Sequence, residues 1–173
     1  MSSKTYLDPT AYQRDIWTLA RMVYESGWKP DLILGLRRGG ATPAIAVHEY
    51  LEWRGWKVRH LPLKCSSYAG MENRTDNVVF ECAAETLATV RPGERVLAVD
   101  DVFDTGKTAE AVRAEIVRRG AECRVACVHW KPGRNLTPGR PDWHVREDGD
   151  GWIVFPHELC GLSPEEARAK GTL

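Results

Sequence analysis

Three aspartates precede a Gly-Lys-Thr sequence in the segment VLAVDDVFDTGKT, which spans residues 96–108. The apolar run VLAV is typical of a strand buried on both faces, and Asp100 and Asp101 follow where that run ends. Asp104 comes next, and the sequence TGKT then opens a helix. Because the first N–H groups of a helix are free and carry positive potential, this turn suits a phosphate group.

Carboxylates beside a phosphate-binding turn imply that the ligand carries more than phosphate. Carboxylates accept hydrogen bonds from vicinal hydroxyls, such as those of a ribose. A magnesium ion can also link carboxylate, hydroxyl and pyrophosphate oxygens. The segment therefore predicts a phosphorylated ligand with hydroxyl groups, bound together with a divalent metal.

Two other interpretations of this segment are open. A nucleoside-triphosphate P-loop also ends in Gly-Lys-Thr, but it needs a glycine five positions before Gly106, where Asp101 stands. A strand with a solvated acidic turn, in which Asp104 caps the helix, needs no ligand. That interpretation leaves three carboxylates around a Gly-Lys-Thr turn unexplained.

A second turn, Arg37-Arg38-Gly39-Gly40, also lies between an expected strand and an expected helix. Its backbone N–H groups can donate to anionic oxygens, and its arginines can neutralise a pyrophosphate. Taken alone, the same residues fit a solvated surface turn. Beside the first segment they favour a second anion-binding loop.

Strands that alternate with helices must position both turns. This order predicts an α/β fold with a mostly parallel twisted sheet flanked by helices, in which ligands bind at the carboxyl ends of the strands. Expected strands are 31–35, 57–63, 78–82, 95–99, 124–130 and 152–155, and expected helices are 9–27, 42–53, 105–120 and one capped by Ser163. The polar stretch 65–76 predicts a loop, and the Pro- and Gly-containing stretch 131–151 a loop or hood.

The composition excludes several classes of protein. The chain has 173 residues, 43% of them apolar and 28% charged, which fits one globular domain. The 24 basic and 24 acidic residues cancel, so no net field attracts nucleic acid or an anionic membrane. No signal core and no membrane span are expected, which favours a cytoplasmic protein. The five cysteines are expected to be reduced, with Cys123 and Cys127 on one face of a strand.

Residues 96–108 closely resemble the signature of type I phosphoribosyltransferases: an apolar strand, two acids, two mostly apolar residues and Asp-Thr-Gly-x-Thr. The resemblance implies that Asp100 and Asp101 face the ribose hydroxyls of phosphoribosyl pyrophosphate (PRPP) and hold Mg²⁺, partly through water. A phosphate loop then binds the 5-phosphate with Asp104, Thr105, Gly106, Lys107 and Thr108. A pyrophosphate turn binds the pyrophosphate with Arg37, Arg38, Gly39 and Gly40, and carries a non-proline cis peptide at Arg37–Arg38.

The polar segment places Ser66, Ser67 and Tyr68 where this family has its catalytic lid. Closure of such a lid keeps water from the reacting ribosyl centre. A flexible surface loop explains the composition equally well.

The C-terminal region resembles the hood of small xanthine-guanine-like purine phosphoribosyltransferases in Lys131-Pro132-Gly133, Pro141-Asp142-Trp143 and residues 151–156. The resemblance implies that Lys131 donates to the 6-oxo group of a purine. Trp152 then stacks on the ring, and the backbone near Trp152 and Ile153 reads its 2-position. Asp104 faces N7 and takes or shares its proton while N9 attacks the anomeric carbon. A surface lysine and a core or interface tryptophan are the alternatives, and His157-Glu158 departs from the aromatic-acid pair of this tail.

We therefore expect one phosphoribosyltransferase domain over residues 1–173, with a core of about 28–130 and a hood of about 131–160 plus the N-terminal segment. Its expected reaction transfers the 5-phosphoribosyl group of PRPP to N9 of hypoxanthine, guanine or xanthine in purine salvage, in a homodimer or homotetramer. The alternatives are a non-catalytic PRPP sensor of the same fold and an enzyme for another base.

Overall fold

The computed structural model describes residues 4–67, 78–79 and 83–171, and the chain forms two compact units. The larger unit is Arg14–Asp150, and the smaller unit joins Met1–Gln13 to Gly151–Leu173. The boundaries of a core and a hood within one domain stay a prediction. Among the described helices, none has the length and apolar content of a membrane span.

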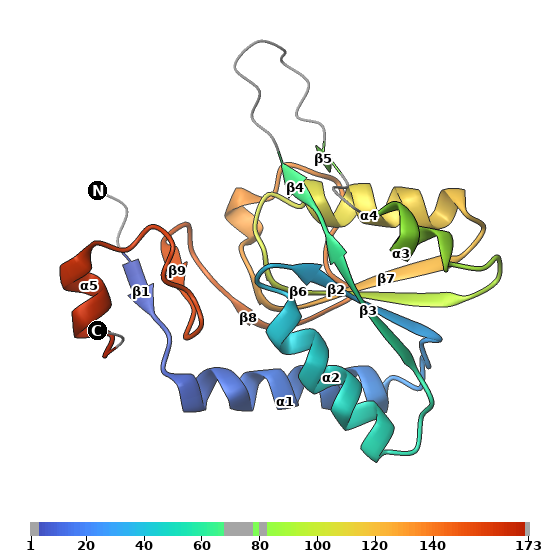
Figure 1. Cartoon of the computed structure of the whole chain (residues 1–173), viewed down its shortest axis with the longest axis horizontal. Coiled ribbons are helices and arrows are strands. Elements are labelled where there is room, and N and C mark those ends of the chain that lie inside the picture. The colour runs from blue at the N-terminus through green and yellow to red at the C-terminus, as the bar shows by residue number, and fades with distance from the viewer. Residues whose placement is uncertain (1–3, 68–77, 80–82, 172–173) are drawn as a thin grey trace, which may run out of the picture. The chain divides into compact units, whose positions relative to one another are not determined.

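The larger unit is built on a sheet of five parallel strands (Figure 1). Its spatial order is β3 (Arg59–Lys64), β2 (Leu32–Arg37), β6 (Arg95–Phe103), β7 (Glu122–Trp130) and β8 (Trp143–Glu147). Every neighbouring pair in this sheet is parallel. The α/β fold with a mostly parallel sheet is therefore confirmed.

Helices cover both faces of this sheet. On one face lie α2 (Ala41–Trp53) and α1 (Pro9–Glu25), and on the other α3 (Ala84–Ala88) and α4 (Lys107–Arg118) (Figure 1). Alternate strand residues form one buried cluster with α3 and α4, and that cluster holds both Cys123 and Cys127, as expected from their spacing. The opposite alternation points Gly35 toward α2, where an added Cβ would lie 2.9 Å from Cβ of Ala44.

The smaller unit pairs β1 (Lys4–Tyr6) with β9 (Trp152–Val154) in parallel. Its helix α5 (Pro164–Ala169) starts at the expected Ser163 cap, which forms a capping box with Glu166. His157 packs here on the ring of Phe155, with centroids 5.8 Å apart. The departure from the aromatic-acid pair therefore keeps a ring-packing role within this unit.

Several expected boundaries were wrong. Strand β6 continues to Phe103 rather than ending at residue 99, because its pairing with β7 extends as far as Phe103 and Trp130. Asp100 and Asp101 therefore lie in a strand and not in a turn. Helix α4 begins at Lys107 rather than at 105, because Gly106 takes a left-handed φ of 79° at the N-cap. Strands β1 and β8 and helix α3 were not expected. Of the stretch 78–82 the structure describes β5 (Val78–Val79), which pairs antiparallel with β4 (Ser66–Ser67).

Candidate functional site

The carboxyl ends of β2, β6 and β7 bring most of the predicted site residues to one edge of the sheet. These three strands are neighbours and parallel, so the residues that follow them meet there. The edge carries the pyrophosphate turn at the end of β2, and Asp100 and Asp101 in β6, here called the acidic pair. The phosphate loop follows β6, and Lys131 follows β7.

The pyrophosphate turn packs directly against the acidic pair. The predicted cis peptide is present at Arg37–Arg38. A Cβ added to Gly39 would lie 1.9 Å from Oδ2 of Asp101, and one added to Gly40 would lie 2.4 Å from the carbonyl oxygen of Val99. Both glycines are therefore required, because any side chain would push the turn off strand β6.

A cavity of about 270 Å³ beside this turn is lined by Arg37, Arg38, Lys64 and Cys65. Three of the four lining side chains are cationic, which suits an anionic group such as pyrophosphate. Sequence reasoning missed Lys64. Its sequence carried no signal for this role, because only the parallel register of the folded sheet places Lys64 opposite Arg37 on the neighbouring strand.

The two carboxylates of the acidic pair interact closely. The N–H of Asp101 donates to Oδ1 of Asp100 at 3.0 Å, and the N–H of Val102 donates to Oδ1 of Asp101 at 2.8 Å. Burial raises the pKa of Asp100 well above its usual range, and the adjacent charge of Asp101 raises it further.

A divalent cation fits this acidic pair, because its charge would offset the cost of burying Asp100 beside a second carboxylate and because Mg²⁺ prefers oxygen ligands. Among the described residues there is no cluster of three or more His, Cys, Asp or Glu side chains that could hold a metal. Magnesium at Asp100 and Asp101 would therefore complete its coordination with water and ligand oxygens.

The phosphate loop encloses a small cavity. Its volume is about 80 Å³, and its lining includes Asp104, Thr105, Gly106 and Thr108, together with Asp100. Lys107 was predicted to take part, but it does not line this cavity. At Gly106 an added Cβ would meet Oγ1 of Thr137 at 2.4 Å, so the loop is packed from behind.

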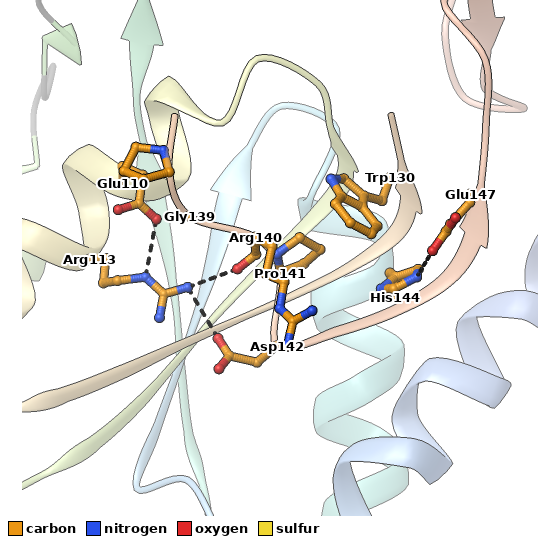
Figure 2. Close-up of a pocket in the computed structure, with 10 residues that line it drawn as sticks. Glu110, Arg113, Trp130, Gly139, Arg140, Pro141, Asp142, His144 and Glu147 are labelled. Atoms are coloured by element: carbon orange, nitrogen blue, oxygen red, sulfur yellow. Dashed lines mark hydrogen bonds and ion pairs between the residues drawn. The ribbon is translucent and has the colours of Figure 1, made fainter. Parts of the chain in front are cut away.

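The segment 135–142 forms that backing. The N–H of Leu136 donates to the carbonyl of Thr105 at 3.0 Å, which ties the segment to the phosphate loop. Figure 2 shows its far end, where Arg113 of α4 donates to the carbonyl of Arg140 and to Asp142, both at 3.2 Å. A wider cavity of about 680 Å³ opens on this far side, and none of the predicted site residues line it.

Asp104 lies between two cations from the turn after β7. Nζ of Lys131 is 3.8 Å from Oδ2 of Asp104, and Nε of Arg134 donates to Oδ1 at 2.5 Å. The Lys131 side chain is only 7% exposed, so the alternative of a plain surface lysine is wrong. The carboxylate of Asp104 raises the pKa of Arg134 through this hydrogen bond and its charge. Sequence reasoning missed Arg134, because nothing in its local sequence marks a contact across 30 residues.

Other predicted residues are placed less completely. Ser66 and Ser67 form β4, while Tyr68 lies outside the described residues, so the lid stays a prediction. Trp152 and Ile153 belong to β9 of the smaller unit, where Trp152 is half exposed and Ile153 is buried. Their contact with a base also stays a prediction.

A parallel α/β sheet with two glycine-containing turns and an acidic pair at one edge fits an enzyme that acts on a phosphorylated sugar. Residues 2–163 match the model of the phosphoribosyl transferase domain, and the chain belongs to this family. It is thus a pentosyltransferase, as its sequence predicted.

Two of the proteins similar to this chain are named as phosphoribosyltransferases of purines. The chain is 34% identical over 131 residues to xanthine-guanine phosphoribosyltransferase of Cereibacter sphaeroides, covering 74% of this chain and 69% of that protein. The structure of a purine phosphoribosyltransferase from Pyrococcus horikoshii matches with a TM-score of 0.72 and 32% identity, over 92% of this chain and 97% of that one. A hypothetical protein from Neisseria gonorrhoeae with bound ppGpp shares the fold, with a TM-score of 0.76 at 22% identity over 99% and 97% of the two chains.

Proposed function

We propose that this enzyme transfers the 5-phosphoribosyl group of PRPP to N9 of a 6-oxopurine, namely hypoxanthine, guanine or xanthine, and releases pyrophosphate in purine salvage. The names of the similar proteins from C. sphaeroides and P. horikoshii support a purine acceptor. The preference for a 6-oxo group rests on the geometry around Asp104.

The observation that carries the proposal is the pairing of Asp104 with a buried lysine. Oδ2 of Asp104 and Nζ of Lys131 lie 3.8 Å apart, so an acceptor and a donor stand side by side. A 6-oxopurine presents N7 and O6 on one edge. With a proton on N7, that edge offers a donor to Asp104 and an acceptor to Lys131. Adenine would instead turn its amino donor toward the ammonium donor of Lys131.

In this reaction each group of site residues binds a different part of the substrates. The pyrophosphate turn and Lys64 hold the leaving group, and the phosphate loop holds the 5-phosphate. Asp100 and Asp101 accept the ribose hydroxyls and would hold Mg²⁺, which when bound supplies positive charge against the departing pyrophosphate. Asp104 accepts the N7 proton while the N9 lone pair attacks the anomeric carbon and the bond from that carbon to the pyrophosphate oxygen breaks.

The direct test is pyrophosphate release from PRPP and magnesium with a panel of bases. Hypoxanthine, guanine and xanthine should support fast release, adenine only slow residual release, and uracil none. Tight PRPP binding without release for any base would favour the PRPP sensor. Release with a non-purine base alone would contradict the assignment of a 6-oxopurine as the acceptor.

Lys131→Met tests how the base is recognised. A hydrogen bond to a charged group is worth about 1.5–3 kcal/mol, so the KM for hypoxanthine should rise by about 10- to 100-fold. Residual activity with adenine should change little. Equal losses for 6-oxo and 6-amino purines would refute the proposed role of Lys131.

A further inference from the structure

Arg134 contacts the carboxylate of Asp104 from the side away from Lys131. Its Nε donates to Oδ1 at 2.5 Å, whereas Lys131 faces the other oxygen, Oδ2. Each of the two cations therefore faces a different oxygen of the Asp104 carboxylate.

The backbone holds Arg134 in this place. Lys131, through its N–H, donates to the carbonyl of Phe103 at 3.0 Å, next to Asp104 in the chain. A single turn of 3₁₀ helix, η1 (Pro132–Arg134), follows, and the N–H of Arg134 donates back to the carbonyl of Lys131 at 3.1 Å. Both cations thus come from one short turn that is hydrogen-bonded to the end of β6.

We propose that Arg134 is a positioning residue for the reaction, an inference that rests on the proposed function. Its bond to Oδ1 fixes the rotation of the Asp104 carboxylate. Oδ2 is then directed at the base beside the Lys131 ammonium, so the pair meets N7 and O6 together. Arg134 contacts neither substrate, and its effect passes through Asp104.

This role differs from an inhibitory contact, in which Arg134 blocks Asp104 until the base binds. An inhibitory Arg134 would compete with the base, so its removal would lower the KM for the base or raise kcat. A positioning residue keeps its bond to Oδ1 while Oδ2 serves the base, so removing it slows the reaction. Loss of positioning by about 1 Å costs on the order of 100-fold in rate.

Arg134→Ala is the first variant, assayed by pyrophosphate release with hypoxanthine. We expect kcat to fall by about 10- to 100-fold, with the KM for PRPP within about twofold of the parent chain. Because the Arg134 side chain is 44% exposed, its removal opens the position to solvent. Millimolar guanidinium ion should therefore restore part of the rate, and Arg134→Lys should retain part of it.

Arg118→Ala is the matched control. Nε of Arg118 donates to Glu115 at 2.9 Å, an exposed ion pair on α4 of the same kind. Its removal should leave kcat unchanged, and guanidinium should have no effect on that variant.

A double-mutant cycle with Asp104→Asn decides whether Arg134 acts through Asp104. We expect Arg134→Ala to cost almost nothing further in the Asp104→Asn background. Multiplying losses, or an Arg134→Ala enzyme as fast as the parent, would overturn the positioning role while leaving the proposed function intact. A parent chain that releases no pyrophosphate with any base would remove both proposals.

Discussion

Gly39→Ala adds one methyl group at the contact between the pyrophosphate turn and the acidic pair. The added Cβ would lie 1.9 Å from Oδ2, 2.3 Å from Cγ and 2.5 Å from Oδ1 of Asp101. The new carbon would therefore overlap all three terminal atoms of the Asp101 side chain at once. Asp101 is itself buried at 9% exposure, which leaves it little room to turn away.

The size of the effect follows from that overlap. Contacts of a Cβ below 3.0 Å essentially never occur, so the turn and the carboxylate must separate by about 1 Å. A displacement of about 1 Å among groups that position a substrate costs on the order of 100-fold. Both displaced groups are assigned to PRPP, so kcat/KM for PRPP should fall by about that factor while the KM for the base stays nearly constant.

The assay is the initial rate of pyrophosphate release over a range of PRPP concentrations, with a thermal melt to confirm folding. Gly149→Ala is the matched control, because a Cβ added at Gly149 would meet nothing within 4 Å. That variant should match the parent chain. A folded Gly39→Ala protein with kcat/KM for PRPP within twofold of the parent would show that the turn and Asp101 do not act together on PRPP.

Three further predictions test other parts of the structure. Gly106→Ala forces a side chain into a left-handed φ of 79°, so urea unfolding should show a loss of about 1–2 kcal/mol in the free energy of unfolding. A variant as stable as the parent chain would contradict the left-handed backbone at this position. Burial lowers the pKa of His60, and the nearby His48 lowers it further. The unfolded chain therefore binds more protons than the folded chain once the pH falls below about 6.5. As a result, Tm should fall as the pH drops from 7 to 5.5. His60→Gln should flatten that fall, and an unchanged slope would assign it to other groups. Burial raises the pKa of Cys123 to about 12, whereas Cys160 is exposed. Iodoacetamide at pH 8 should therefore label Cys160 well before Cys123, which peptide mass spectrometry can follow. Equal labelling of the two thiols would contradict the burial of Cys123.

The part of the site that lies on one continuous segment could be predicted from the sequence. Asp100, Asp101 and the phosphate loop follow each other along β6 and into α4, so local pattern was enough to group them. The turn after β2 joined them because parallel neighbouring strands end at the same edge. The boundaries failed where pairing overrides local pattern, as at the end of β6.

Contacts between distant segments could not be predicted in this way. Arg134 reaches Asp104 only because the turn after β7 is hydrogen-bonded to Phe103. Strand β8 was missed because the Pro and Gly residues of the stretch 131–151 favoured a loop over the five residues WHVRE, which form the edge strand beside β7. The pairing of Arg37 with Lys64 needed a register that the sequence does not reveal.

The connection between β7 and β8 carries three attachments in a single stretch of chain. Its start holds Lys131 and Arg134 against Asp104, its middle is bonded to the phosphate loop through Leu136, and its end is fixed by Arg113. An insertion or deletion within it would change acceptor recognition and phosphate binding together. Engineering of a new acceptor specificity should therefore exchange side chains at constant loop length, and natural divergence in this connection should be subject to the same constraint.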